Sequence, residues 1–216
     1  MTLLERVQIA GFDLDGTLVD SVRTSYETNC LVIPRFGGAA PDYEEFRRAL
    51  TCFRDWSSFF SQFGVPAEET EKILEAYYEI EYVSHFNAIN GSIETLERIQ
   101  QKAIPLFLVT TNPSRENVFK RMRDSKIEKF FSLEEVYNGE SSAKETSIRE
   151  AVLKRGIEPS SAIFVGDTKN DMLQAKSAGV ISIGIANEFS YNPRDMILEA
   201  NPDYVLQNIK DLLSLE

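Results

Sequence analysis

Two aspartates follow the first apolar run of the chain. The run Val7 to Phe12 is short and rich in β-forming residues, and Asp13 and Asp15 come directly after it, with Gly16 next. Alternate residues of an extended chain point to the same side, so we expect the two carboxylates to lie close together. Their repulsion then requires a cation or a proton, and a divalent metal ion is the natural solution. An Asp-Gly hairpin turn is the alternative, but the following residues have a helical pattern rather than that of a returning strand.

A second acidic pair follows a later apolar run, Ala162 to Val165. Asp167 stands at the end of this run, and Asp171 falls in the first turn of the helix predicted to follow, where the helix dipole favours a negative charge. Taken alone, the segment would also fit a helix cap with an ordinary surface aspartate. Together with Asp13 and Asp15 it indicates a site made of oxygen ligands, which suits Mg²⁺ better than zinc.

Two hydroxyl residues, Thr110 and Thr111, end the run Pro105 to Val109. Asn112 is a suitable N-cap and Pro113 a suitable first residue for the helix predicted to begin there, so free backbone N–H groups should lie beside the hydroxyls. A strand end of this kind predicts an anion-binding site. Ordinary helix capping is the alternative interpretation.

Two basic residues are candidates to bind anionic groups. Lys144 begins a helical pattern and offers a point positive charge that suits a phosphoryl oxygen. Arg54 precedes an aromatic-rich stretch, and its guanidinium fork could hold a carboxylate or a second phosphate of a substrate. The alternative for Arg54 is a surface arginine paired with a neighbouring acid.

Alternating apolar runs and amphipathic stretches must position these residues. The predicted strands are Val7 to Phe12, Pro105 to Val109, Ala162 to Val165, Val180 to Ile185 and Tyr204 to Leu206. The predicted helices are Gly91 to Ala103, Pro113 to Ser125, Ala143 to Arg155 and Asn170 to Ala178. Strand alternating with helix at this spacing predicts a doubly wound, Rossmann-like α/β fold, in which helices cover both faces of a parallel sheet.

One segment interrupts this alternation. Residues 21–88 contain no convincing strand but several helical patterns, including the acidic amphipathic run Ala67 to Phe86. Because the segment is inserted after the first strand, it can lie over that strand's carboxyl end, where open α/β sheets bind ligands. We therefore predict a core of residues 1–19 and 89–216 with an inserted helical subdomain of residues 20–88.

Composition and charge exclude several classes of protein. The 216 residues carry a net charge of −11 without basic runs, so neither a nucleic acid nor an acidic membrane surface is expected as a partner. Two cysteines, no secretory signal and no apolar stretch of membrane-spanning length predict a cytoplasmic protein. A single histidine, His85, excludes multi-histidine zinc sites and leaves carboxylates as the main source of chemistry. The sequence predicts no particular oligomeric state.

The segments Asp13 to Thr17 (DLDGT) and Val165 to Asp167 (VGD), together with Asp171, resemble the haloacid dehalogenase superfamily of phosphohydrolases, in particular its phosphoglycolate phosphatase branch. The resemblance covers almost the whole chain, including the order in which the acidic and hydroxyl residues occur. It implies a Rossmann-like core with an α-helical cap, Mg²⁺ as the cofactor and a small phosphate ester as the substrate. It also implies an aspartyl-phosphate intermediate, with Asp13 as the nucleophile and Asp15 as the general acid and base.

The resemblance implies further roles at the same site. The metal ligands would be Asp13, Asp15, Asp167 and Asp171, and the phosphate-binding residues would be Thr110, Thr111 and Lys144. Only one of the two threonines is needed: counting from Gly91 favours Thr110, whereas the Asn-Pro-Ser-Arg continuation favours Thr111. Many cap-bearing members have proline after the lysine, where this chain has Glu145.

A Mg²⁺-dependent phosphatase is therefore the leading prediction. An aspartate is already ionised at neutral pH, so it can attack phosphorus without a base to activate it. One alternative is a phosphomutase similar to β-phosphoglucomutase, which returns the phosphoryl group to a sugar. An alternative of another class is a signalling or non-catalytic module that binds phosphate and Mg²⁺. A two-component receiver domain gathers similar residues but has no room for an insertion of this length.

Overall fold

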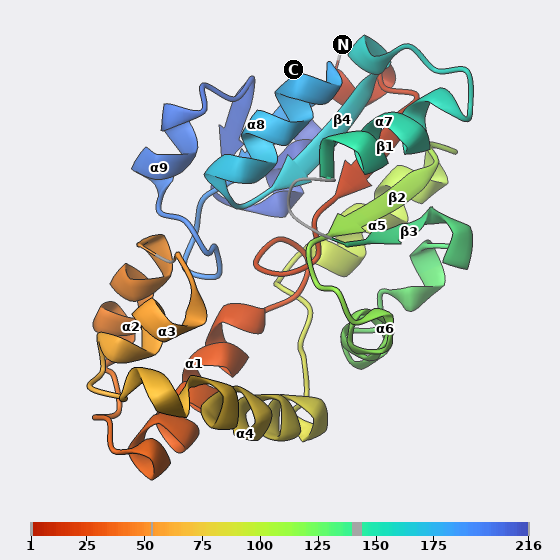
Figure 1. The fold of residues 1–216 in the computed structure, drawn as a ribbon. Coiled ribbons are helices and arrows are strands. Elements are labelled where there is room, and N and C mark those ends of the chain that lie inside the picture. The colour runs from red at the N-terminus through yellow and green to blue at the C-terminus, as the bar shows by residue number, and fades with distance from the viewer. Residues whose placement is uncertain (1, 53, 140–143, 216) are drawn as a thin grey trace. The chain divides into compact units, whose positions relative to one another are not determined.

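The computed structural model describes residues 2–52, 54–139 and 144–215, which form two compact units. Unit 1 comprises Met1–Asp20 and Phe86–Glu216, and unit 2 comprises Ser21–His85. The chain thus leaves unit 1 after the loop that carries Asp13 and Asp15, and it returns at Phe86 (Figure 1). Within unit 1 the two ends of the insertion run side by side, because the Asp20 N–H donates to the Asn87 carbonyl at 2.9 Å.

Unit 1 is built on a six-stranded sheet in the order β3-β2-β1-β4-β5-β6. The strands are β1 (Ile9–Phe12), β2 (Leu106–Thr110), β3 (Val136–Asn138), β4 (Ala162–Gly166), β5 (Ile181–Ile185) and β6 (Tyr204–Leu206). Every neighbouring pair is parallel. The strand order reverses direction between β1 and β4, and ligands of doubly wound sheets bind at the carboxyl ends of the strands at such a switch point. The predicted doubly wound fold is confirmed.

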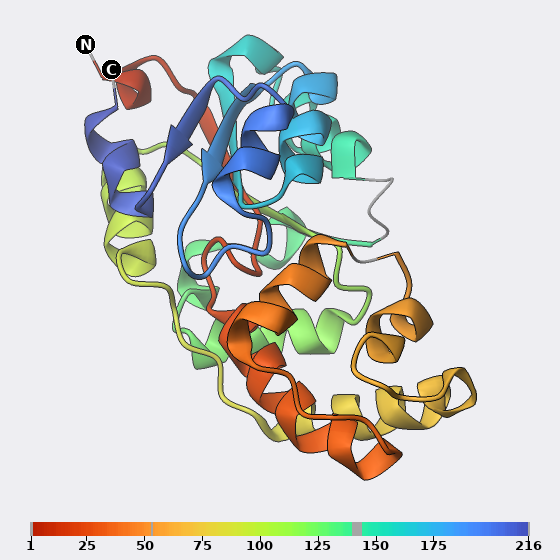
Figure 2. The ribbon, with the colours of Figure 1, turned by 90° about the vertical axis from the view of Figure 1, so that its left-hand side faces the viewer.

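Helices cover both faces of this sheet (Figures 1 and 2). The main helices of unit 1 are α5 (Ser92–Gln101), α6 (Arg115–Asp124), α7 (Lys144–Leu153), α8 (Lys169–Ala178) and α9 (Arg194–Glu199). Short 3₁₀ turns lie between them: η1 (Leu3–Glu5), η4 (Glu128–Phe130), η5 (Leu133–Glu135), η7 (Pro159–Ser161) and η8 (Ile209–Ser214). The predicted helix from Ala143 begins at a residue outside the described ranges.

Two hydrophobic cores lie on opposite faces of the sheet, because successive strand residues point to opposite sides. On one face, Phe107 and Val109 of β2 pack with the apolar sides of α7 and α8. On the other face, Leu106 and Leu108 of the same strand pack with α5, α6 and η8. Burial on both faces explains why the strands read as continuous apolar runs rather than as alternating patterns.

The described residues of unit 2 form helices joined by loops, without a strand. Its elements are α1 (Ser21–Val32), η2 (Ile33–Phe36), α2 (Tyr43–Thr51), α3 (Trp56–Ser61), η3 (Ala67–Glu69) and α4 (Thr70–Val83). Aromatic rings form its centre: Phe59 and Phe60 are fully buried, and the Trp56 ring stacks on Phe60 at a centroid distance of 5.7 Å. Asp42 and Asp55 are the N-caps of α2 and α3. Each aspartate side chain accepts a backbone N–H from the first turn of its helix, which is a favourable position for an acidic residue.

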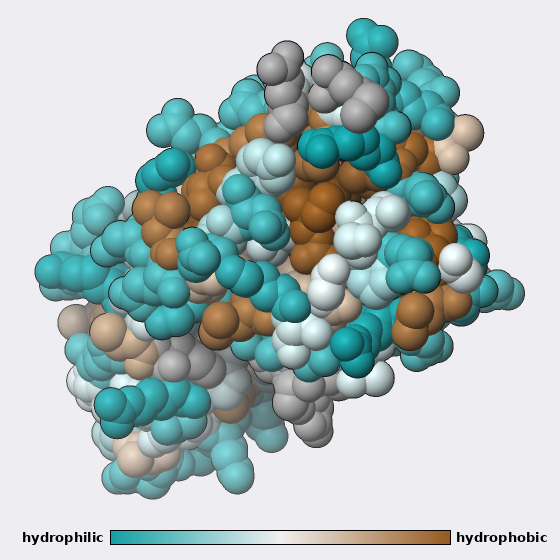
Figure 3. All heavy atoms as spheres, turned by 90° about the horizontal axis from the view of Figure 1, so that it is seen from above, coloured by the Kyte–Doolittle hydropathy of each residue, from teal (hydrophilic) through white to brown (hydrophobic). Residues whose placement is uncertain are grey.

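No helix among the described residues has the length and apolar character needed to cross a membrane. The longest of them, α4, has 14 residues, whereas a span requires about 20. On the face shown in Figure 3, hydrophilic residues surround a central group of hydrophobic ones.

Candidate active site

The loop after β1 places Asp13 at the switch point of the sheet. The Asp13 N–H donates to the Val165 carbonyl at 2.8 Å, which extends the pairing of β1 with β4 by one residue. The chain then bends at Leu14, whose carbonyl accepts N–H groups from Leu18 at 2.9 Å and Val19 at 3.0 Å. Gly16 makes this tight turn possible, because its φ of 77° is left-handed.

Three buried carboxylates meet at this point: Asp13, Asp167 and Asp171. Each offers an oxygen within 4.8 Å of the others. Asp13 and Asp167 follow β1 and β4, which are neighbours in the sheet, and Asp171 lies in the first turn of α8. The predicted meeting of acids from both ends of the chain is therefore observed for these three residues.

Lys144, the first residue of α7, lies between two of the carboxylates. Its Nζ donates to Asp13 Oδ1 at 2.7 Å and to Asp171 Oδ1 at 2.5 Å, and only 3% of its side chain is exposed. Burial alone would lower the pKa of Lys144, but the charges of Asp13 and Asp171 outweigh it and raise this pKa. The lysine is therefore charged at neutral pH.

Asp171 has two roles at once. Its Oδ2 accepts the backbone N–H of Thr168 at 3.0 Å and the hydroxyl of Thr168 at 2.7 Å, which completes a capping box at the start of α8. Its Oδ1 accepts from Lys144. The helix-cap interpretation of Asp171 is thus correct for one oxygen, and it leaves the other oxygen to the site.

Asp167 is the most deeply buried of the three acids, with no exposed surface. The Thr17 hydroxyl donates to its Oδ1 at 3.0 Å, and the Tyr191 N–H donates to its Oδ2 at 2.6 Å. Burial and the charges of Asp13 and Asp171 raise the pKa of Asp167, although both hydrogen bonds act in the opposite direction. Burial likewise raises the pKa of Asp13 to about 7, against the attraction of Lys144.

The charge of this group fits a divalent cation. Three carboxylates against one ammonium leave a formal charge of −2 when all are ionised, and the two raised pKa values show that this charge is not compensated. Oxygen donors alone are the ligands that Mg²⁺ prefers. The donor set therefore fits a divalent cation such as Mg²⁺, which Asp13, Asp167 and Asp171 would hold.

The carboxylate of Asp15 does not join this group. Asp15 Oδ1 instead accepts from Nη1 of Arg121 on α6. Because β1 ends at Phe12 and the chain bends at Leu14, the alternation of an extended strand does not decide the direction of Asp15, although its charge still acts on Asp13. Asp15 is thus separate from the expected set of four metal-binding carboxylates.

The two threonines after Val109 differ in burial. Thr110 is the last residue of β2 and is buried, whereas Thr111 is exposed. The helix also begins later than predicted: Ser114, not Asn112, is the N-cap of α6, and its side chain accepts the Asn117 N–H. Asn112 instead accepts the Ser114 N–H at 3.0 Å, a turn that competes with capping.

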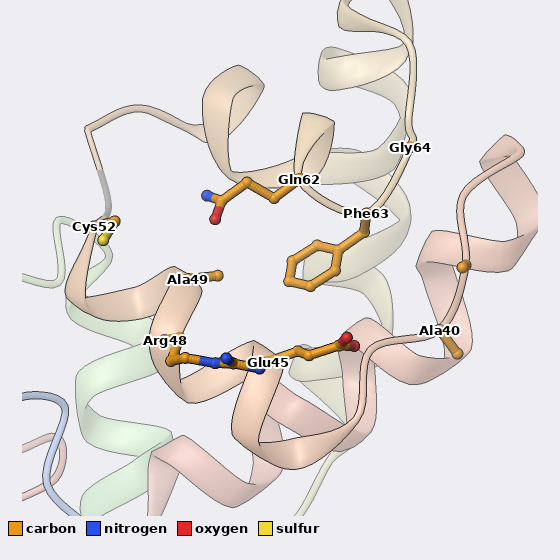
Figure 4. Close-up of a pocket in the computed structure, with 9 residues that line it drawn as sticks. Ala40, Glu45, Arg48, Ala49, Cys52, Gln62, Phe63 and Gly64 are labelled. Atoms are coloured by element: carbon orange, nitrogen blue, oxygen red, sulfur yellow. The ribbon is translucent and has the colours of Figure 1, made fainter.

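Arg54 belongs to unit 2, where it is exposed between α2 and α3. A hollow of about 530 Å³ in the same unit is lined by Glu45, Arg48, Gln62 and Phe63, among others (Figure 4). Arg54 is not among the lining residues. Within the described part of the chain Arg54 makes no hydrogen bond or ion pair, and its role as an anion ligand stays a prediction.

Three residues of the site had no role in the sequence prediction. Thr17 belongs to the DLDGT segment, so the sequence contained a local motif from which its position in the site could have been predicted. Tyr191 contributes its backbone N–H, which any residue except proline would supply. Arg121 stands in a helix with several other basic residues, and no local pattern marks it as the partner of Asp15.

Replacing Gly16 by Ala should damage this site more than an ordinary glycine substitution does. A Cβ at Gly16 would lie 2.4 Å from Asp167 Oδ2, and the φ of 77° already disfavours a side chain. Gly156 is a matched control, because its φ is 66° and nothing lies within 4 Å of its Cβ position. We expect Gly156→Ala to cost about 1–2 kcal/mol of unfolding free energy, and Gly16→Ala about 2 kcal/mol more. Equal losses in urea titrations of the two variants would contradict the close contact with Asp167.

A doubly wound sheet with a lysine and a carboxylate group at its switch point defines an α/β protein that can bind a cation and an anion together. A family model described as haloacid dehalogenase-like hydrolase matches residues 11–185. Phosphoglycolate phosphatase 1 of Pseudomonas aeruginosa is 30% identical over 214 residues, which cover 94% of this chain and 77% of that protein. The chain belongs to the haloacid dehalogenase-like hydrolase family, and the predicted family is confirmed.

Solved structures share the fold along the whole chain. A haloacid dehalogenase-like family hydrolase of Streptococcus pneumoniae has a TM-score of 0.78 and 23% identity, with 97% of this chain and 98% of that chain covered. A predicted β-phosphoglucomutase of Thermotoga maritima has a TM-score of 0.72 and 22% identity, with 96% and 97% covered. Both comparisons support the Rossmann-like fold.

Proposed function

We propose that this chain is a Mg²⁺-dependent phosphatase that hydrolyses a small phosphomonoester through an aspartyl phosphate on Asp13. The observation that carries the proposal is the buried group of Asp13, Asp167 and Asp171 with Lys144 between them. Phosphoryl transfer requires a nucleophile and positive charge around the phosphoryl oxygens. Lys144 supplies one positive charge, and a bound Mg²⁺ would neutralise further negative charge.

Each side chain then has one task in two half-reactions. Asp13 attacks phosphorus, the bond from phosphorus to the ester oxygen breaks, and Asp15 gives its proton to the leaving alcohol. Water next attacks the phosphoryl group on Asp13 and loses a proton to Asp15, which releases inorganic phosphate and restores both residues. The buried Thr110 hydroxyl, at the end of β2, is the better of the two threonines to bind a phosphoryl oxygen.

The similarity to phosphoglycolate phosphatases suggests the class of substrate. We propose a small phosphorylated carboxylic acid such as 2-phosphoglycolate. Unit 2 serves as the cap in this proposal, because it is inserted directly after the loop of Asp13 and Asp15. Arg54 of this unit remains a proposed ligand for the carboxylate of the substrate.

The direct test is phosphate release from a panel of phosphomonoesters with Mg²⁺ and with EDTA. We expect Mg²⁺-dependent hydrolysis of 2-phosphoglycolate and slower hydrolysis of 4-nitrophenyl phosphate. Sugar phosphates belong in the panel, because a phosphomutase would convert them to isomers without releasing phosphate. Isomer formation without hydrolysis would favour the mutase, and no reaction with any ester would remove the proposal.

Magnesium should stabilise the protein more at high pH than at low pH. Burial raises the pKa of Asp13 from 3.8 to about 7, so between these values the metal-free folded state binds more protons than the unfolded chain. The contribution of Asp13 to the unfolding free energy therefore falls as pH rises through this window. Mg²⁺ binds the ionised carboxylates, so its stabilising effect grows over the same range.

Thermal unfolding with and without Mg²⁺ at pH 5.5 and pH 8 measures this difference. We expect the increase in Tm on adding Mg²⁺ to be several times larger at pH 8. The Asp13→Asn variant is the control, since it lacks one of the two titrating groups and should show a smaller pH dependence, with the remainder due to Asp167. An equal increase at both pH values would show that ionisation of these carboxylates does not limit metal binding.

A further inference from the structure

We infer that Arg121 is a positioning residue that holds the Asp15 carboxylate in place for catalysis. This inference rests on the proposed function, in which Asp15 is the acid and base. It goes beyond that function because it assigns a role to a helix residue that does not touch the group of Asp13, Asp167 and Asp171.

The contact between Arg121 and Asp15 is a partly buried tertiary ion pair. Arg121 Nη1 donates to Asp15 Oδ1, and 8% of the arginine side chain and 17% of the aspartate side chain are exposed. Arg121 lies on α6 between Val118 and Met122, which pack into the core on the sheet face of the helix. A basic residue in the last turn of a helix is often a solvated side chain, but this one is 6% exposed and points to the loop after β1.

The guanidinium is itself held in place by an aromatic ring. Arg121 Cζ lies 4.8 Å from the centroid of the Phe86 ring, and Lys120 Nζ lies 5.1 Å from the same centroid. Phe86 is 2% exposed, and Asp124 Oδ2 accepts its backbone N–H at 3.4 Å. Stacking on this ring and the packing of α6 restrict the arginine, so it presents its donor to Asp15 from a fixed direction.

Asp15 needs such a partner because of its place in the chain. It is two residues from Asp13, and its carboxylate would be repelled by the three acids of the site. Lys144 is already shared by Asp13 and Asp171. Arg121 therefore supplies the positive charge that keeps the Asp15 carboxylate outside the metal-binding group and fixes its direction.

A purely structural ion pair is the competing explanation, and it predicts different results. Buried ion pairs add little net stability, so a structural role would appear as a change in stability with no selective effect on rates. A positioning role acts through Asp15. It should lower the rate most when the leaving group needs a proton, as the alkoxide of 2-phosphoglycolate does, and least for 4-nitrophenolate, which leaves without one.

The experiment compares Arg121→Met, Arg121→Lys and Asp15→Asn by kcat/KM with both substrates in the presence of Mg²⁺. For Arg121→Met we expect a loss of about 10- to 100-fold with 2-phosphoglycolate and of less than about threefold with 4-nitrophenyl phosphate. Arg121→Lys should recover most of the loss. The double variant should be no slower than Asp15→Asn alone, because the arginine acts through that aspartate.

Lys120→Met is the matched control. It removes a cation above the same Phe86 ring, but Lys120 forms its ion pair with Asp124. We expect its kcat/KM to stay within about twofold of the wild type for both substrates. Equal losses with both substrates in Arg121→Met, or additive losses in the double variant, would overturn the inference while leaving the phosphatase proposal intact.

A crystal structure of metal-free Arg121→Met gives a second readout that needs no activity. We expect the Asp15 carboxylate to leave the position it has in the wild type. If it stays in place, Arg121 does not position it and the inference is wrong. A wild type that hydrolyses neither substrate would contradict the proposed function separately, and the crystal structures would still decide the role of Arg121. Arg121→Lys serves in both measurements if Arg121→Met does not fold.

Discussion

Replacing Asp13 by Asn should reduce kcat by at least about 10³-fold, because the neutral amide cannot attack phosphorus. The change is nearly isosteric, and Lys144 keeps its second acidic partner, Asp171, 2.5 Å away. The variant should therefore fold. Steady-state phosphate release measures the loss, and mass spectrometry of acid-quenched enzyme should show a phosphorylated peptide containing Asp13 in the wild type only.

The stability of this variant sharpens the test. Burial raises the pKa of Asp13, so the ionised carboxylate is unfavourable in the metal-free protein. Asp13→Asn should then be at least as stable as the wild type at pH 8 without Mg²⁺. Asp195→Asn, at an exposed position of α9, is the control and should be fully active. An Asp13→Asn enzyme that retains a tenth of the wild-type kcat would rule out Asp13 as the nucleophile.

The second large effect is expected for Lys144→Met. Methionine fills a similar volume but leaves the buried carboxylates of Asp13 and Asp171 without their ammonium partner. Removing one member of a buried ion pair costs about 3–5 kcal/mol, so the metal-free variant should unfold at much lower urea concentrations than the wild type. Mg²⁺ should recover part of this loss, since it supplies positive charge to the same carboxylates.

Urea titrations of Lys144→Met with and without Mg²⁺ measure both effects. Lys129→Met is the control, because Lys129 is largely exposed in its pair with Glu97 and should matter little. We also expect kcat/KM to fall, because Lys144 is the cation proposed for the phosphoryl oxygens. An unchanged unfolding midpoint would mean that the carboxylates become protonated in the variant, so that the stability of the protein does not depend on the lysine.

The sequence predicted the sheet well where strands are buried on both faces. The runs at Ala162 and Val180 became β4 and β5, and β2 is displaced from the predicted strand by one residue. The edge strand β3 was missed, since Val136–Asn138 has three residues and only one is fully buried. The other edge strand, β6, is equally short, but its three residues Tyr204 to Leu206 are all apolar or aromatic and were predicted, whereas β3 ends in the polar Asn138.

The sequence could predict those positions of the site that depend only on the order of the strands in the sheet. Acids at the ends of two neighbouring parallel strands must meet, which is why Asp13 and Asp167 were placed together correctly. Asp15 could not be placed in the same way, because its direction depends on a bend at Leu14 and on an arginine 106 residues away. Such a contact depends on the packing of α6, which no short sequence pattern encodes.

The single tryptophan of the chain, Trp56, lies in the aromatic centre of unit 2. Fluorescence excited near 295 nm therefore reports on that unit alone, whereas far-ultraviolet circular dichroism follows the helices of both units. Coincident denaturation curves from the two signals would show that the units unfold as one cooperative body. Two different midpoints would show that each unit has its own unfolding free energy. The tryptophan of unit 2 makes this measurement possible without an added fluorescent label.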